Sequence, residues 1–217
     1  MKRIAIRRLA LTALTAATLS VVLTGCFPIL AGGVAGGALV ATDRRTSGAQ
    51  LEDEGIELRA ASRIRTNVGD RVHVNVASYN RQVLLTGEVP NEQDKQLVEQ
   101  IVTRVENVTG VVNELAISGN STLAQRSSDA LVTGRVKANL LDARDLFSNA
   151  FKVVTERGTT YLMGRVTQRE ADRATALVRS TPGVQRVVRM FEIISEDELA
   201  RMLPTPAKPQ PATANKP

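Results

Sequence analysis

The 217-residue sequence contains few of the residues that cross-link small extracellular domains, ligate metals or stack on bases. It has one cysteine, one histidine and no tryptophan, and aromatic residues make up 3% of it. A single cysteine cannot form a disulfide within the chain, so the stability of the fold depends on packing alone. The lone histidine, His73, has no second histidine or cysteine with which to share a metal ion. We therefore expect no metal site and no bound cofactor.

Catalytic motifs are also missing. The sequence lacks the G-x-S-x-G, H-E-x-x-H and P-loop patterns that place a nucleophile, a zinc ion or a nucleotide phosphate. Carboxylate pairs such as Asp94 and Glu99 fall where helix surfaces are expected, and solvated carboxylates are normal there. We therefore predict that the protein is not an enzyme and takes no small-molecule substrate.

The N-terminus lacks the run of about 20 apolar residues that a membrane-spanning helix needs. Four cations stand within the first eight residues, and a shorter apolar run containing threonines follows from Leu9 to Leu23. A charged head followed by an apolar run is typical of a secretion signal. The run closes on Leu23-Thr24-Gly25-Cys26, which resembles the lipobox of bacterial lipoproteins. This resemblance implies that residues 1–25 are a cleaved signal peptide and that Cys26 is acylated; the alternative is a small buried cysteine.

A nucleic acid partner is not expected, although the formal net charge is +6. Four of the cations belong to the signal and leave with it, and secretion separates the chain from nucleic acid. The two tyrosines, Tyr79 and Tyr161, offer little surface for stacking on bases.

The segments that flank the folded part are expected to be unstructured. Residues 26–54 begin with a glycine-rich stretch of small residues, which predicts a flexible tether behind the acylated cysteine. Within this tether, residues 42–48 are polar, and a solvated linker is favoured there over a recognition segment. Residues 196–217 are rich in proline and poor in apolar anchors, which predicts a disordered tail.

Between these segments the sequence repeats itself. Residues 74–89 match residues 151–166 with a constant offset of 77, and a further match follows at an offset of 76. Two offsets that differ by a single deletion indicate a duplication. We predict two copies of one domain, at 55–120 and 126–195. Because each is small enough for its core to be marginal, the two copies are expected to pack on one another.

Each copy is predicted to fold as α-β-β-α-β, which places the protein in the α+β class. Alternating β-branched residues on both sides of a short turn predict the hairpins, and apolar residues at a spacing of three and four predict the helices. Asp129 is placed to cap the first helix of the second copy. In chain order the expected elements are a helix through 56–68, a hairpin about 78–81, a helix over 91–105 and a strand over 108–117, then a helix over 129–141, a hairpin about 156–158, a helix over 168–180 and a strand over 184–194.

Charge is unevenly divided between the two copies. Residues 55–120 hold 7 Lys and Arg against 8 Asp and Glu, whereas residues 126–195 hold 12 against 7. In and after the first helix of the second copy, cations stand beside leucines, the combination that an interfacial membrane site requires. The alternative is that Leu141 or Leu146 joins the core and the cations only aid solubility. The candidate phospholipid-binding residues are Leu131, Arg135, Lys137, Leu141 and Arg144.

The repeated pattern resembles the BON domain. It reads Val83-x-Leu85-x-Gly87-x-Val89 in the first copy and Tyr161-Leu162-Met163-Gly164-x-Val166 in the second. Two such domains behind a lipobox are similar to the dual BON-domain outer-membrane lipoproteins. The motifs occupy core and turn positions, so they specify the fold better than the chemistry.

This resemblance implies a function at the bacterial envelope. Members of the family are associated with outer-membrane integrity, with anionic phospholipid and with the proteins that assemble outer-membrane barrels. The resemblance implies a lipid-anchored protein on the outer membrane whose domains face the periplasm, and Phe27, in place of aspartate after the cysteine, agrees with that location. The expected function is non-catalytic binding of anionic phospholipid in support of envelope integrity; the alternative is a protein-binding adaptor for barrel assembly.

The family's lipid-contacting surface lies around the first helix of the second domain, here residues 129–141. This chain departs from the family pattern at two positions. Leu131 stands where the family can place an aromatic residue, and Gly134 lowers helix propensity by about 1 kcal/mol relative to alanine.

Overall fold

The structure, a computed structural model, describes residues 43–202. The predicted signal peptide, Cys26 and most of the predicted tether and tail lie outside the described residues. The elements of the first copy are α3 (Ser47–Val68), η1 (Gly69–Arg71), β1 (His73–Tyr79), β2 (Gln82–Val89), α4 (Glu92–Thr103), β3 (Gly110–Asn113) and β4 (Ala116–Ile117). Those that follow are α5 (Leu123–Asp142), η2 (Ser148–Ala150), β5 (Lys152–Glu156), β6 (Thr159–Val166), α6 (Gln168–Arg179), β7 (Arg186–Ile193) and α7 (Glu196–Met202).

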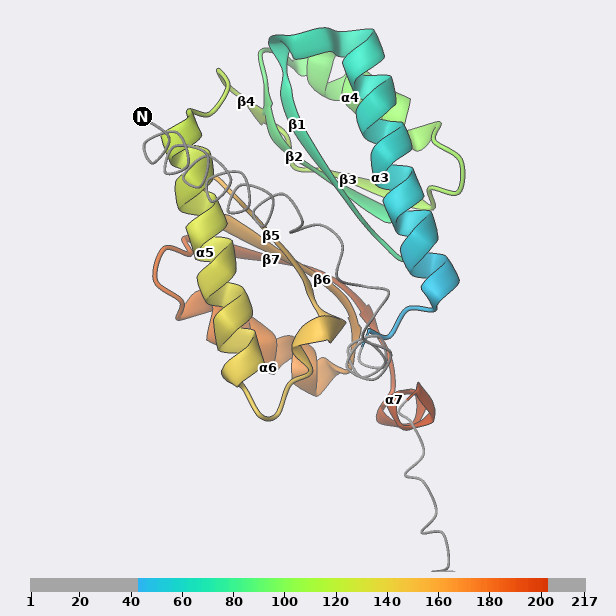
Figure 1. Cartoon of the computed structure of the whole chain (residues 1–217), viewed down its shortest axis with the longest axis vertical. Helices are drawn as coiled ribbons and strands as arrows, with labels where there is room; N and C mark the ends of the chain where they lie inside the picture. The colour runs from blue at the N-terminus through green and yellow to red at the C-terminus, as the bar shows by residue number, and fades with distance from the viewer. Residues whose placement is uncertain (1–42, 203–217) are drawn as a thin grey trace, which may run out of the picture. The chain divides into compact units, whose positions relative to one another are not determined.

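In each copy a hairpin supplies two strands, and a crossover helix returns the chain to a parallel third strand. β1 pairs antiparallel with β2, from His73 opposite Glu88 to Tyr79 opposite Gln82, and β3 and β4 pair parallel with β2. β5, β6 and β7 repeat this order. Helices α3 and α4 cover one face of the first sheet, and α5 and α6 cover one face of the second (Figure 1). The predicted α-β-β-α-β order is therefore confirmed in both copies.

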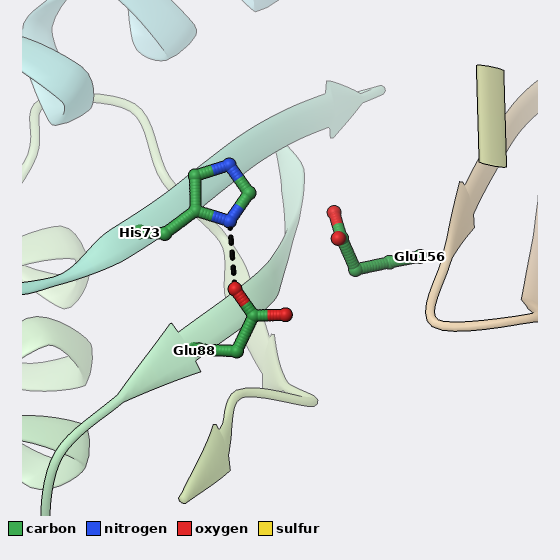
Figure 2. Close-up of side chains that lie close together, drawn as sticks. All are labelled: His73, Glu88 and Glu156. Atoms are coloured by element: carbon green, nitrogen blue, oxygen red, sulfur yellow. Dashed lines mark hydrogen bonds and ion pairs between the residues drawn. The ribbon is translucent and has the colours of Figure 1, made fainter. Parts of the chain in front are cut away.

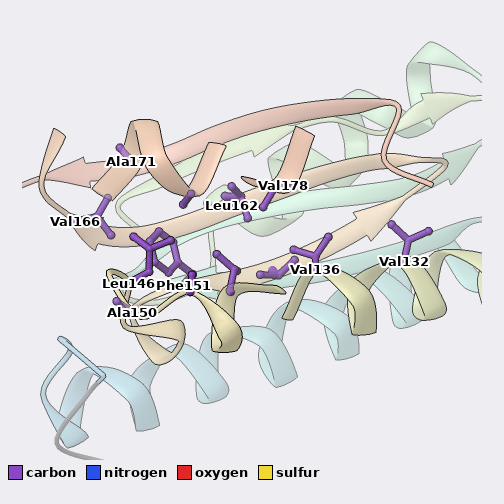
Figure 3. Packing of buried hydrophobic residues seen from close by; sticks show 13 residues of the cluster. Val132, Val136, Leu146, Ala150, Phe151, Leu162, Val166, Ala171 and Val178 are labelled. Atoms are coloured by element: carbon purple, nitrogen blue, oxygen red, sulfur yellow. The ribbon is translucent and has the colours of Figure 1, made fainter. Parts of the chain in front are cut away.

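The helix-covered faces hold the two main cores. In the second copy, Val132, Val136 and Leu140 recur every fourth residue along α5 and so lie on one side of it. They pack against alternate residues of the sheet, including Leu162 and Val166, and against α6 (Figure 3). The equivalent core of the first copy is built from α3, α4 and the same strand positions. Helical and strand periods in the sequence thus predicted which side of each element is buried.

The opposite faces of the two sheets are buried as well. Every residue of β2 after Gln82 is buried, as the unbroken apolar run Val83-Leu84-Leu85 indicates for a strand covered on both sides. Leu84 and Tyr79 from the first sheet form a common cluster with Tyr161 and Met163 from the second. The two copies therefore pack sheet against sheet, as their small individual cores predicted.

The predicted tether of residues 26–54 extends too far, because α3 begins at Ser47 with Thr46 as its N-cap. Residues 42–48 are, where described, not a solvated linker. Arg44 is 9% exposed and forms a two-pronged ion pair of 2.7 Å with the buried Glu170. Arg45 pairs with Asp53 at 2.8 Å and stacks over the ring of Tyr79. Most of these partners are distant in sequence, so local composition does not reveal them.

Asp129 does not cap a helix. Helix α5 starts six residues before it, where Thr122 and Gln125 form a reciprocal capping box. The Asp129 carboxylate instead accepts hydrogen bonds from the backbone N–H groups of Arg157 and Gly158, at 2.9 and 3.0 Å.

Two further boundaries differ from the prediction. The third strand of the first copy is split into β3 and β4, and between them the Leu115 N–H donates to the Asn113 side chain at 3.2 Å. The predicted disordered tail begins too early, because residues 196–202 form α7 and bury Leu199. The remainder of that tail, from residue 203, lies outside the described residues.

Candidate functional site: the outer face of helix α5

The outer face of α5 carries exposed leucines. Leu131 and Leu141 are 63% and 71% exposed, and Leu123 at the start of the helix is 81% exposed. At 3.6 residues per turn, Leu131 and Leu141 point away from the side that Val136 and Leu140 bury in the core. The leucines predicted for lipid contact are therefore on the surface. The alternative that a leucine of this region joins the core is wrong for Leu141 and right for Leu146, which is 7% exposed.

The candidate cations adjoin these leucines. Arg135 stands four residues after Leu131, and Lys137 stands four residues before Leu141, so each cation neighbours one leucine on the helix surface. Arg135, Lys137 and Arg144 are all exposed, and Arg144 lies in the loop that follows the helix. The Arg135 Nη1 atom lies 3.5 Å from the carbonyl oxygen of Pro182. Within residues 43–202, none of the three cations forms an ion pair, so their charge is available to an external anion.

The equivalent helix of the first copy provides a contrast. Helix α3 also exposes two leucines, Leu51 and Leu58, at 71% and 74%. It carries four acidic and three basic residues, however, whereas α5 carries two acidic and three basic residues. One of the two acids of α5, Asp129, is buried and bonded to the turn. Of these two helices, only α5 combines exposed leucines with an excess of surface cations.

A hollow of about 470 Å³ opens at the N-terminal half of α5. Arg135 and Arg157 line it together with Asp129 and with uncharged polar groups that include Ser128 and Gln185. Arg157 lies in the β5–β6 turn with a φ of 51°, and no motif in the sequence marks it. Its position 22 residues from Arg135 follows no helical or strand period, so only the fold brings the two guanidinium groups to one hollow.

A second group of polar side chains lies where strands of the two copies meet. His73, Glu88 and Glu156 place their ligand atoms within 4.8 Å of one another, and Figure 2 shows them converging from β1, β2 and β5. The His73 Nδ1 atom lies 2.8 Å from Oε2 of Glu88. Glu88 is fully buried and Glu156 is 6% exposed.

The two carboxyl groups of this cluster respond differently to burial. Burial by itself raises the pKa of Glu88, but hydrogen bonds from Ser121 and His73 outweigh it and the net pKa is lowered. Burial raises the pKa of Glu156, and the hydrogen bond from Asn75 does not offset that effect. No sequence pattern joins His73 to Glu156, which lies in the other copy.

No helix within residues 43–202 is both long and apolar enough to cross a membrane.

Comparison with known proteins identifies relatives. A family model described as BON domain matches residues 53–119 and residues 128–195. "Outer membrane lipoprotein DolP" of Haemophilus influenzae is 35% identical over 177 residues, which cover 81% of this chain and 92% of that protein. The "21 kDa hemolysin" of Actinobacillus pleuropneumoniae is 29% identical over 154 residues, 70% of this chain and 79% of that protein. A solved chain of CdsD from Chlamydia trachomatis, 15% identical over 70% of this chain and 96% of that chain, has a TM-score of 0.28, too low to carry an argument.

Proposed function

This chain belongs to the BON-domain family and is a dual BON-domain protein of the DolP-like type, and from that premise we propose that it is a non-catalytic outer-membrane lipoprotein that binds anionic phospholipid through α5. In this proposal Cys26 carries the lipid anchor, and the two domains face the periplasm. The binding supports the integrity of the envelope. The observation that carries the proposal is the exposure of Leu131 and Leu141 beside cations without an ion-pair partner in residues 43–202, on one helix face.

The two kinds of side chain contribute different parts of the binding free energy. A leucine that moves fully out of water contributes about 1.5–3 kcal/mol, and partial insertion at the headgroup boundary gives a fraction of that. Each cation near an anionic surface contributes about 1 kcal/mol. Leu131, Leu141, Arg135 and Lys137 together therefore give a weak but selective contact with acidic headgroups.

The anchor makes a weak contact sufficient. Two acyl chains hold a protein stably at a bilayer, so α5 acts at the high effective concentration that the tether behind Cys26 provides. Arg157 and Arg135 both line the hollow beside α5. In this proposal the hollow receives the phosphate group of a lipid, and the two guanidinium groups pair with it. The leucine face and the hollow share Arg135, so loss of this residue affects both.

A vesicle-binding experiment tests the proposal. The chain from residue 26, with Cys26→Ser to prevent acylation, is titrated with vesicles of neutral lipid containing increasing fractions of phosphatidylglycerol. We expect binding to rise with the anionic fraction and to fall with added salt. Leu131→Glu and Arg135→Glu are each expected to weaken it at least about tenfold, which corresponds to about 1.4 kcal/mol.

Matched controls come from the first domain. Leu58→Glu introduces the same charge at a similarly exposed leucine of α3, and Arg65→Glu reverses an exposed cation of that helix. Both variants are expected to bind like the parent. Binding that ignores the anionic fraction, or that survives both α5 substitutions, would instead favour a protein-binding adaptor in barrel assembly.

A further inference from the structure

We propose that His73, Glu88 and Glu156 form a binding site for one divalent cation of the zinc class, which joins the two BON domains. The site is distinct from the leucine face of α5, although Arg157, which lies 3.7 Å from Glu88, also lines the hollow beside that helix. It takes two ligands from the first domain and one from the second.

The donor set and its spacing suit such a cation. An imidazole nitrogen and two carboxylate oxygens are all ordinary ligands of Zn²⁺, at about 2.0–2.2 Å from the ion. Ligands at that distance in a tetrahedron lie on the order of 3.4 Å from one another, and the three ligand atoms here already lie within 4.8 Å. Small side-chain rotations therefore bring them to coordinating distance.

Glu88 supplies an independent sign of a missing partner. Its Oε1 atom is buried and accepts no hydrogen bond in the described part of the chain, whereas its Oε2 atom is bonded to His73 and to the Ser121 N–H. The Arg157 guanidinium lies 3.7 Å from Oε1 but donates to Ser118 instead. Figure 2 shows this oxygen on the side of Glu156. A buried carboxylate oxygen without a donor is costly, and a cation at the cluster would satisfy it.

The surrounding groups already orient the ligands. Asn75 donates to Oε2 of Glu156 at 2.6 Å, and the Ser121 N–H donates to Oε2 of Glu88 at 3.1 Å. Each carboxylate thus has one oxygen held by a donor, and the Oε1 atom of Glu88 accepts no hydrogen bond from the described residues. Outer hydrogen bonds of this kind fix the orientation of metal ligands in established sites. The His73 side chain is 16% exposed, which leaves the cation a route from solvent and room for a water ligand.

The duplication places this donor set at one end of the domain interface only. At the offset of 77, His73 and Glu88 correspond to Ala150 and Arg165, and Glu156 corresponds to Tyr79. At that other end the Arg165 N–H donates to the Tyr79 hydroxyl, with no cluster of ligands in the described structure. Matching positions of the two copies therefore meet in both places, but only one place has acquired metal-binding residues.

The imidazole ligand indicates which divalent cation the site prefers. Mg²⁺ and Ca²⁺ prefer six or more oxygen ligands, whereas imidazole suits Zn²⁺ and its neighbours in the first transition series. A set of one nitrogen and two oxygens therefore favours Zn²⁺ over Mg²⁺ at equal concentration.

Zinc binding to the acylated full chain in detergent tests the proposal, with an affinity tag that contains no histidine. After chelator treatment, calorimetric titration with ZnCl2 is expected to show one ion per chain and a higher melting temperature, whereas MgCl2 has neither effect. Because the chain has one histidine, any imidazole ligand seen by X-ray absorption belongs to His73. His73→Asn and Glu156→Gln are each expected to weaken binding at least about tenfold, whereas the exposed Glu54→Gln leaves it unchanged.

Melting in the presence of chelator separates loss of ligand from loss of fold. Glu156→Gln removes only a charge and keeps the shape of the side chain, so the metal-free variant is expected to melt no lower than the parent. The proposal is overturned if zinc does not bind at one ion per chain, if the absorption spectrum shows no imidazole ligand, or if folded Glu156→Gln binds zinc as the parent does.

Discussion

At the scale of single residues, the glycines of the repeated motif carry a steric requirement. Gly87 has a φ of 113°, and a Cβ atom there would lie 2.1 Å from the carbonyl oxygen of His73. Gly164, at the matching position, would bring a Cβ atom to 2.4 Å from the carbonyl oxygen of Ala150. Each glycine thus allows one hairpin strand to approach its partner closely. In contrast, a Cβ atom at Gly134 on α5 would meet nothing within 4 Å among the described residues.

Opposite effects are expected from the same substitution at these positions. Gly87→Ala should lower the free energy of unfolding by at least about 2 kcal/mol, because the strained φ and the backbone clash add. Gly134→Ala should raise it by about 1 kcal/mol through helix propensity. Urea denaturation of both variants measures the difference, and a neutral Gly87→Ala would contradict the steric argument.

At the scale of elements, a helical aspartate ties each first helix to its hairpin turn. Asp53 accepts hydrogen bonds from the N–H groups of Asn80 and Arg81, both at 2.8 Å, and Asp129 does the same for the turn of the second domain. Both central residues of each turn have positive φ, as tight hairpin turns require. The aspartates therefore stabilise turns in which residues such as Arg81 adopt a backbone conformation that is unfavourable for them.

Asp53 also predicts how stability depends on pH. Burial by itself raises the pKa of Asp53, but hydrogen bonds from Ser78 and from the Arg81 N–H outweigh it and lower the pKa below the ordinary 3.8. A lowered pKa in the folded state means that this stabilisation is present above pH 3.8 and is lost as the pH falls through the folded pKa.

Asp53→Asn is expected to lower the free energy of unfolding by about 1–3 kcal/mol at about pH 7. The variant should also lose less stability than the parent between about pH 4 and pH 2. Urea denaturation across this range checks both effects, with the exposed Glu54→Gln as control. If the free energy of unfolding falls with pH equally in the variant and the parent, Asp53 is not the source of the acid sensitivity.

At the scale of the whole molecule, one buried ion pair connects the start of the first domain to the second. Arg44 lies just before Thr46, the N-cap of α3, and its guanidinium forms two hydrogen bonds with Glu170. Glu170 is 1% exposed and takes part in the capping box of α6. Burial by itself raises the pKa of Glu170, but the Arg44 guanidinium and the Thr167 N–H lower it. The pair thus joins the entry of the first domain to the helix framework of the second.

Arg44→Ala is expected to destabilise the protein by about 3–5 kcal/mol, because it leaves the Glu170 carboxylate buried without its partner. Adding Glu170→Gln should recover part of the loss, since the remaining group is neutral. Arg63→Ala, which breaks the exposed pair with Glu106, should cost about 0–1 kcal/mol. If urea denaturation shows the same loss of unfolding free energy for Arg44→Ala and Arg63→Ala, the buried pair stabilises the fold no more than the exposed pair does.

The sequence by itself determined the duplication, the order of the elements and the side of each element that meets its own core. Those properties follow from local periods of about two and 3.6 residues and from a fixed offset between copies. It also determined that Leu131 and Arg135 are neighbours on a helix, because a spacing of four is enough to establish it.

Only the tertiary structure decided what meets across the two domains. The burial of Arg44 on Glu170, the hollow lined by both Arg135 and Arg157, and the convergence of His73 with Glu156 join residues that no local period relates. Periodicity states that a strand face is buried, but the partner of that face depends on how two sheets pack, and packing is a property of the folded chain as a whole.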